Sequence, residues 1–67
     1  MARPDRQEID LEEVKRALEH PTYRSVQPDG RLRHWVWVGQ HQRWLRVVIE
    51  SDGETVHNAF FDRGFVP

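Results

Sequence analysis

The fold of this chain is decided by residues 31–61, which read RLRHWVWVGQHQRWLRVVIESDGETVHNAFF. Three runs in this stretch are rich in valine, isoleucine, tryptophan and phenylalanine: residues 31–38, 43–50 and 55–61. Such runs are typical of β-strands, and the polar connections between them are short enough to indicate antiparallel neighbours. The stretch therefore predicts three strands of an antiparallel meander.

The first connection, GQHQ at residues 39–42, predicts the register of the first hairpin. If all of these residues form the loop, Val36 lies opposite Leu45 and Trp35 lies opposite Arg46. The same register also gives two further pairs: Trp37 with Trp44, and Leu32 with Ile49.

The second connection contains Asp52-Gly53, a dipeptide that favours a type I′ hairpin turn. A turn centred there places Val48 opposite His57. The remaining predicted pairs of this hairpin are Ile49 with Val56, Val47 with Asn58, Leu45 with Phe60, and Trp44 with Phe61.

Side chains alternate across a sheet, so these registers predict two faces of different character. The first face is mostly aliphatic and consists of Leu32, His34, Val36, Leu45, Val47, Ile49, Val56, Asn58 and Phe60. The second face mixes bulky side chains with arginine and histidine and consists of Arg33, Trp35, Trp37, Trp44, Arg46, Val48, His57, Ala59 and Phe61. On the first face, His34 and Asn58 are expected to form a buried hydrogen-bonded pair.

An amphipathic helix precedes the strands. Asp10 is a favourable N-cap, and Glu13 completes a capping box. Apolar residues follow at helical spacing: Leu11, Val14, Ala17 and Leu18. His20-Pro21 ends the helix, because a residue before proline avoids the α conformation. We expect this helix to cover the first face and to leave the second face uncovered.

The chain has 67 residues, which is enough for a single domain. Residues 1–8 are polar and are expected to be loose or to form a short helical turn. Residues 22–26 predict an edge strand or an extended segment, and Pro28-Asp29-Gly30 predicts a turn. The expected fold class is α+β, with one N-terminal helix packed on a three- to four-stranded antiparallel β-meander that spans residues 1–67.

Composition excludes several classes of function. The chain contains no cysteine, so it has neither a disulfide framework nor a thiolate zinc site. Its histidines match no metal-ligand spacing, and it has no glycine-rich phosphate loop and no nucleophile motif, so we expect no metal and no cofactor. No apolar run approaches the roughly 20 residues of a membrane-spanning helix. We therefore expect no membrane contact and take the cytoplasm as the default location.

The middle of the chain carries a local excess of positive charge. Residues 21–49 hold five arginines and one aspartate, together with all three tryptophans and the only tyrosine, although the whole chain has a net charge of −1. Arginine neutralises and forks onto phosphates, and tryptophan stacks on unpaired bases. This composition makes the second face a candidate RNA-binding surface.

On that interpretation, Arg33 and Arg46 hold a phosphate, His57 lies beside Arg46 as a general acid or base, and Trp35 or Trp37 stacks a base. Two other interpretations stay open. The same side chains suit a half-buried sheet face that packs on the N-terminal segment or on a second subunit. They also suit a surface that binds another protein, because exposed aromatic patches are typical of such surfaces.

Several phrases of the chain resemble a known group of proteins. DLEEVKRALEHP, DGRLRHWVWV and RWLRVVIESDGETVHNAFFDR, which fall within about residues 3–63, look like the small uncharacterised toxin-like branch of the RelE and barnase–EndoU superfamily. The resemblance implies a helix followed by an antiparallel sheet. It also implies a ribonuclease-like toxin, or a degenerate relative, that is paired with an antitoxin.

The resemblance further implies an RNA site lined by Arg33, Arg46, His57 and Asn58. The chain departs from the group at two points. Asn58 stands where threonine is usual, and the histidine that often opens the first segment is absent, so that Arg3 or Arg6 would take its place. These departures bear on catalysis more than on fold, and a shared fold does not establish a shared reaction.

Two hypotheses follow. The first is an RNA-directed domain of a toxin–antitoxin module that acts as a metal-independent endoribonuclease, with RNA and an antitoxin as partners. Its catalytic residues would be His57, Arg46 and Arg33, and its RNA-binding residues would be Arg31, Trp35, Trp37, Trp44 and Asn58. The alternative is a non-catalytic domain that dimerises or binds another protein through the aromatic sheet face.

Overall fold

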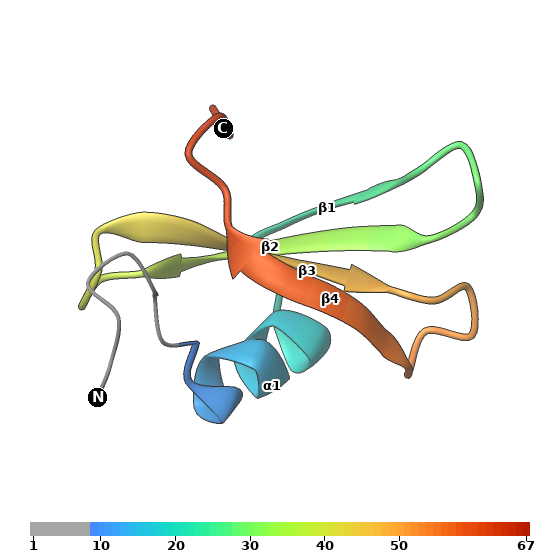
Figure 1. The fold of residues 1–67 in the computed structure, drawn as a ribbon, viewed down its shortest axis with the longest axis horizontal. Helices are drawn as coiled ribbons and strands as arrows, with labels where there is room; N and C mark the ends of the chain where they lie inside the picture. The colour runs from blue at the N-terminus through green and yellow to red at the C-terminus, as the bar shows by residue number, and fades with distance from the viewer. Residues whose placement is uncertain (1–8) are drawn as a thin grey trace, which may run out of the picture.

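The computed structural model describes residues 9–67. Its elements follow one another as α1 (Leu11–Glu19), β1 (Tyr23–Val26), β2 (Leu32–Val38), β3 (Arg43–Ile49) and β4 (Val56–Phe61). The strands form one antiparallel sheet in the order β1-β2-β3-β4, with α1 packed against one side of it (Figure 1). The predicted α+β class and the meander are confirmed. The expectations for residues 1–8, including Arg3 and Arg6, lie outside the described residues.

Helix α1 begins and ends where its capping residues predict. The Asp10 carboxylate accepts a hydrogen bond from the Glu12 N–H at 2.9 Å, and His20 is the C-cap. The Glu13 carboxylate accepts a hydrogen bond from Arg16. The prediction that Leu11 belongs to the buried stripe is wrong, because its side chain is 81% exposed. Leu11 lies on the first turn of α1 and is not among the residues that pack on the core.

The first hairpin has the predicted register. β2 and β3 pair with Val36 opposite Leu45 and Trp35 opposite Arg46. The loop between them consists of residues 39–42, and a left-handed φ of 51° at Gln42 closes it. Because this loop has the expected length, the assignment of β2 and β3 side chains to the two faces is confirmed.

The second hairpin departs from the predicted register after its first pair. Ile49 lies opposite Val56 as expected, but Val48 lies opposite Asn58 rather than His57. His57 is therefore the extra residue of a β-bulge, which shifts the rest of β4 by one position. The shift exchanges four residues between the faces: Asn58 and Phe60 share a face with Val48 and Arg46, whereas Ala59 and Phe61 pack on the core.

The turn between β3 and β4 is also not the predicted type I′ turn. The Gly53 N–H donates to the Glu50 carbonyl at 2.9 Å, and a left-handed φ of 78° occurs at Gly53 but not at Asp52. The Asp52 carboxylate instead accepts hydrogen bonds from the Thr55 N–H and hydroxyl at 2.9 and 2.7 Å. These bonds lower the pKa of Asp52, and the hydroxyl bond is the largest cause. A side chain that satisfies the loop backbone offers an alternative to the two-residue turn.

The core lies between α1 and the sheet. Its buried apolar residues are Ala17, Val36, Val38, Leu45, Val47 and Ile49. The partly buried residues packed around it are Ile9, Val14, Leu18, Leu32, Ala59 and Phe61. We call the sheet face that contributes to this core the helix face, and the opposite one the distal face.

One buried polar side chain joins the helix to the sheet. His34, on the helix face of β2, places its Nδ1 2.8 Å from the Ala17 carbonyl oxygen. A carbonyl only accepts, so Nδ1 carries the proton. The predicted pair of His34 with Asn58 is wrong, because the bulge turns Asn58 to the distal face.

Candidate functional site

The distal face has two ends of different chemistry. Its aromatic end consists of Tyr23, Trp35, Trp37 and Trp44, with Phe65 from the C-terminal segment. Its polar end consists of Arg31, Arg33, Glu50, His57 and Asn58. Arg46 lies between the ends: its guanidinium carbon is 6.0 Å from the Trp35 ring centre and 5.1 Å from that of Phe60, which lies opposite it on β4.

Trp35 is the best covered ring of the aromatic end. Its side chain is 7% exposed, and Phe65 stacks on it at 4.4 Å between ring centres and 14° between planes. The Trp35 Nε1–H donates to the Asp62 carboxylate at 3.2 Å. The expectation of an uncovered second face is therefore wrong at Trp35, because the chain returns over it after β4.

The other two tryptophans are more accessible. Trp37 is 43% exposed, and Trp44 is half-buried. Their rings meet edge to face, with 5.4 Å between ring centres, which is a favoured geometry for aromatic pairs. Trp37 is therefore the predicted stacking residue that keeps accessible surface.

The two arginines proposed for phosphate binding lie on the same face, and both flank Trp35. The Arg33 guanidinium carbon is 5.8 Å from the Trp35 ring centre, and its Nε donates to the Ser25 hydroxyl at 3.0 Å. Arg46 pairs with Asp62 at 3.4 Å, and its buried Nε has no hydrogen-bond partner among the described residues. Within residues 9–67, no carboxylate forms an ion pair with Arg33. Arg33 is thus the distal-face arginine whose charge is least compensated.

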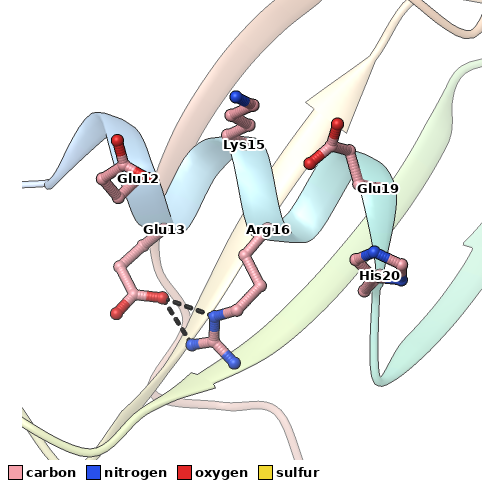
Figure 2. Close-up of a pocket in the computed structure, with 6 residues that line it drawn as sticks. All are labelled: Glu12, Glu13, Lys15, Arg16, Glu19 and His20. Carbon is pink, nitrogen blue, oxygen red and sulfur yellow. Dashed lines mark hydrogen bonds and ion pairs between the residues drawn. The ribbon is translucent and has the colours of Figure 1, made fainter.

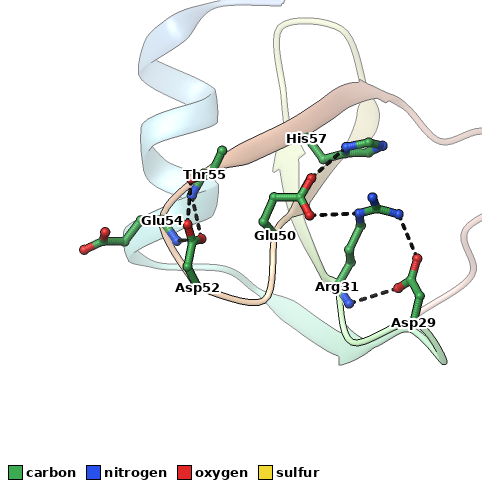
Figure 3. A network of polar contacts seen from close by, with 7 residues as sticks. All are labelled: Asp29, Arg31, Glu50, Asp52, Glu54, Thr55 and His57. Atoms are coloured by element: carbon green, nitrogen blue, oxygen red, sulfur yellow. Dashed lines mark hydrogen bonds and ion pairs between the residues drawn. The ribbon is translucent and has the colours of Figure 1, made fainter.

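His57 lies in a chain of polar contacts at the polar end, which Figure 3 shows. Its Nδ1 is 2.8 Å from Oε2 of Glu50, and the other Glu50 oxygen accepts from Nε of Arg31 at 3.0 Å. Arg31 in turn pairs with Asp29 at 2.8 Å. His57 was predicted to lie beside Arg46; the contact that the structure gives it is with Glu50, and Phe60 lies opposite Arg46.

The contacts of this network shift the pKa values of two of its groups. The hydrogen bond to Glu50 is the largest cause that raises the pKa of Arg31. The Arg31 backbone N–H is the largest cause that lowers the pKa of Asp29. Because a carboxylate only accepts, His57 presents a protonated Nδ1 to Glu50. Its Nε2 is then free to accept a proton, on a side chain that is 42% exposed.

The structure therefore gathers all eight predicted site residues on the distal face, in two groups. Arg31, Arg33, His57 and Asn58 lie at the polar end, and Trp35, Trp37 and Trp44 lie at the aromatic end, with Arg46 between them. Asn58 is exposed there, although its predicted register had placed it on the helix side.

Sequence reasoning missed four further residues at this site: Glu50, Phe60, Asp62 and Phe65. The alternation of β3 could have found Glu50, since Trp44, Arg46 and Val48 continue to it at intervals of two. Phe60 was assigned to the wrong face because no local signal marks the bulge. No pattern in the sequence indicates that Asp62 and Phe65 return over Trp35, because they follow the last strand.

The rest of the described surface carries weaker candidates for a ligand site. A hollow on the outer side of α1, shown in Figure 2, is lined by Glu12, Glu13, Lys15, Arg16, Glu19 and His20. Its acidic and basic groups alternate along one helix and favour no single charged ligand. In residues 9–67 no group of three or more metal-ligating side chains occurs, and no helix has the length and apolar character needed to cross a membrane.

Comparison of the chain with protein-family models, curated proteins and solved structures gives no significant match.

Proposed function

We propose that this chain is an RNA-directed domain of a toxin–antitoxin module and that it cleaves RNA without a metal. The observation that carries the proposal is the Glu50–His57 pair at the end of a face that also bears Arg33 and Arg46. A histidine oriented by a carboxylate is a suitable general base, and arginines on the same surface suit a phosphodiester. The resemblance to the toxin-like branch agrees with this chemistry and stays a prediction.

The proposed reaction is attack of a ribose 2′-hydroxyl on the adjacent phosphorus. Nε2 of His57 removes the hydroxyl proton, the O2′–P bond forms and the P–O5′ bond breaks. Water protonates the departing 5′ oxygen, and the resulting hydroxide takes the proton from the imidazolium. Arg33 and Arg46 stabilise the charge that develops on the phosphoryl oxygens. Glu50 stabilises the imidazolium through Nδ1, in the way that a carboxylate orients a catalytic histidine.

The test is cleavage of a labelled single-stranded RNA in the presence of a metal chelator. His57→Ala should lower the cleavage rate by about 100-fold or more, which is the usual contribution of a general acid–base residue. Glu50→Gln should lower it less, by about tenfold, because the imidazole remains. His41→Ala is the matched control, since His41 is an exposed histidine in the β2–β3 loop, and it should leave the rate unchanged.

Expression in a bacterial host is an independent test. The proposal predicts growth arrest by the wild-type chain and relief by Arg46→Ala. Purified wild-type chain that cleaves no RNA, or His57→Ala that cleaves as fast as wild type, would refute the catalytic role.

A second function is favoured by a separate observation. Tyr23 and Trp37 are each 43% exposed and Phe60 is 40% exposed, all on the distal face. Exposed aromatic side chains are enriched where proteins bind each other. We therefore keep as the alternative a non-catalytic domain that dimerises or binds a protein through this surface. It predicts harmless expression, no RNA turnover and a mass in solution that rises with concentration.

A further inference from the structure

Phe65 fills a slot whose three sides are aromatic rings. Trp35 lies parallel to it, with 4.4 Å between ring centres and 14° between planes. Tyr23 and Trp44 stand at steep angles to it, at 5.6 Å with 59° and at 5.3 Å with 73°. Trp35 is thus the platform of the slot, and the other two rings are its walls. Figure 1 shows that the chain beyond β4 runs on the side of the sheet opposite α1.

An anionic group of the same segment lies beside the slot. Oδ2 of Asp62 accepts from the Trp35 Nε1–H at 3.2 Å and pairs with Nη1 of Arg46 at 3.4 Å. The Arg46 pair is long, and the buried Nε of this arginine has no partner in the described part of the chain. Displacement of Asp62 would therefore free Nη1 of Arg46 for an anion, such as a phosphate, that presents several oxygens.

A flat ring parallel to a tryptophan, with a negative charge held by an adjacent arginine, has the same two features as a bound nucleotide. An unpaired base stacks on an aromatic platform, and its phosphate takes the guanidinium. We infer that the slot between Tyr23, Trp35 and Trp44 is a subsite for one unpaired nucleotide of RNA. In the free chain, Phe65 occupies the place of the base and Asp62 that of the phosphate. This inference rests on the proposed function. The ligand is one RNA nucleotide, and Phe65 and Asp62 of the chain itself compete with it.

The segment from Asp62 onward is held by contacts that a ligand can replace. The Asp62 N–H donates to the Trp44 carbonyl at 2.8 Å, and no backbone–backbone hydrogen bond of the described chain involves a later residue. Beyond that point the Asp62 side chain caps the Gly64 N–H at 3.1 Å, and the Phe65 ring packs in the slot. Displacement therefore breaks ring packing, the hydrogen bond from Trp35 to Asp62 and one ion pair, but no strand pairing.

The test measures binding of a short single-stranded 2′-O-methyl oligouridylate, which lacks the attacking hydroxyl and so separates binding from cleavage. Phe65→Ala empties the slot and should tighten binding by about tenfold, because the competing ring is removed. Val66→Ala is the matched control, since Val66 belongs to the same segment and is 85% exposed; its affinity should equal that of wild type. Quenching of tryptophan fluorescence reports stacking, and circular dichroism reports folding.

Asp62→Asn is the second variant and does not require the slot to be emptied. It removes the competing charge and should tighten binding by about threefold while making the salt dependence steeper, because Arg46 becomes available to a phosphate. This variant therefore tests the phosphate position at Arg46, whereas Phe65→Ala tests the base position.

The outcomes separate the inference from the proposed function. A folded Phe65→Ala variant that binds no tighter than Val66→Ala overturns the inference, while cleavage that depends on His57 would still stand. If Phe65→Ala does not fold, tighter binding by Asp62→Asn supports the subsite, and unchanged binding overturns it. A wild-type chain that neither binds the oligouridylate nor cleaves RNA refutes both.

Discussion

The two faces of the sheet are covered by different kinds of side chain. On the helix face, most aliphatic side chains of β2 and β3 are buried against Ala17, and Leu32 is partly buried beside them. On the distal face, aromatic rings cover one another at one end, and arginine, glutamate and histidine side chains lie over the other. The first arrangement serves stability. The second leaves charged groups and rings accessible, which is what a binding surface requires.

The size of the helix explains this division. α1 has 9 residues and packs against β2 and β3. One short helix covers one side of a sheet, so the distal face must find other cover. In the described residues this cover is Phe65, which packs on the rings of the aromatic end. At the polar end, by contrast, the arginine and histidine side chains remain near solvent.

The largest expected effect compares one residue of each face. Val47 and Val48 are neighbours on β3, both are buried, and they point to opposite faces. Val47→Ala should lower the free energy of unfolding by about 2–3 kcal/mol, since it leaves a cavity in rigid aliphatic packing. Val48→Ala should cost only about 1 kcal/mol, because the flexible stems of neighbouring long side chains can close over the smaller residue. Urea unfolding measures both, and equal losses would show that the distal face packs as rigidly as the core.

A smaller effect is expected from Trp37→Ala at the aromatic end. The variant loses the edge contact with Trp44 from a side chain that is 43% exposed, so the free energy of unfolding should fall by about 1 kcal/mol. If the aromatic end associates with a second chain, the same variant should abolish the rise of mass with concentration in sedimentation experiments. Val66→Ala serves as control, and association that survives Trp37→Ala would exclude this end as the interface.

The smallest expected effect is on the stability of the chain at acid pH, through Asp29 at the polar end. The pKa of Asp29 in the folded chain lies below its usual value, chiefly because the Arg31 N–H donates to its carboxylate. The stabilisation is therefore fully present above the unfolded-state pKa of roughly 4 and is lost as the pH falls through the lower folded-state pKa. Asp29→Asn should be slightly less stable than wild type at neutral pH and lose less stability on acidification. Parallel pH profiles of the urea midpoint would contradict this role for Asp29.

The first hairpin and the helix boundaries follow from local signals. A loop of the expected length fixes the pairing of β2 with β3, and Asp10 and His20-Pro21 delimit α1. These features depend on backbone geometry within a few residues, so the sequence contains the information needed to predict them. His57, Arg33 and Arg46 could also be placed on one surface, although the Glu50 partner of His57 was not predicted.

The second hairpin needed tertiary information. The extra residue at His57 is invisible in the pattern of VHNAFF, because alternation through either register puts an apolar residue on each face. What decides between the registers is that Phe61 and Ala59 fit against the core beside Leu45 and Val47, while Asn58 and Phe60 do not have to be buried. A bulge of one residue satisfies this packing and brings His57 to Glu50.

The amino-acid sequence by itself determined the fold class, the capped helix, the strand order and the collection of arginine and tryptophan on one face, because hydrophobic period and turn chemistry act locally. Only the tertiary structure decided that β4 bulges, that Glu50 orients His57, and that Asp62 and Phe65 return over Trp35. These three features join residues that are distant in the chain or depend on which side chains fill the core, and packing in three dimensions selects among arrangements that the local pattern leaves equivalent.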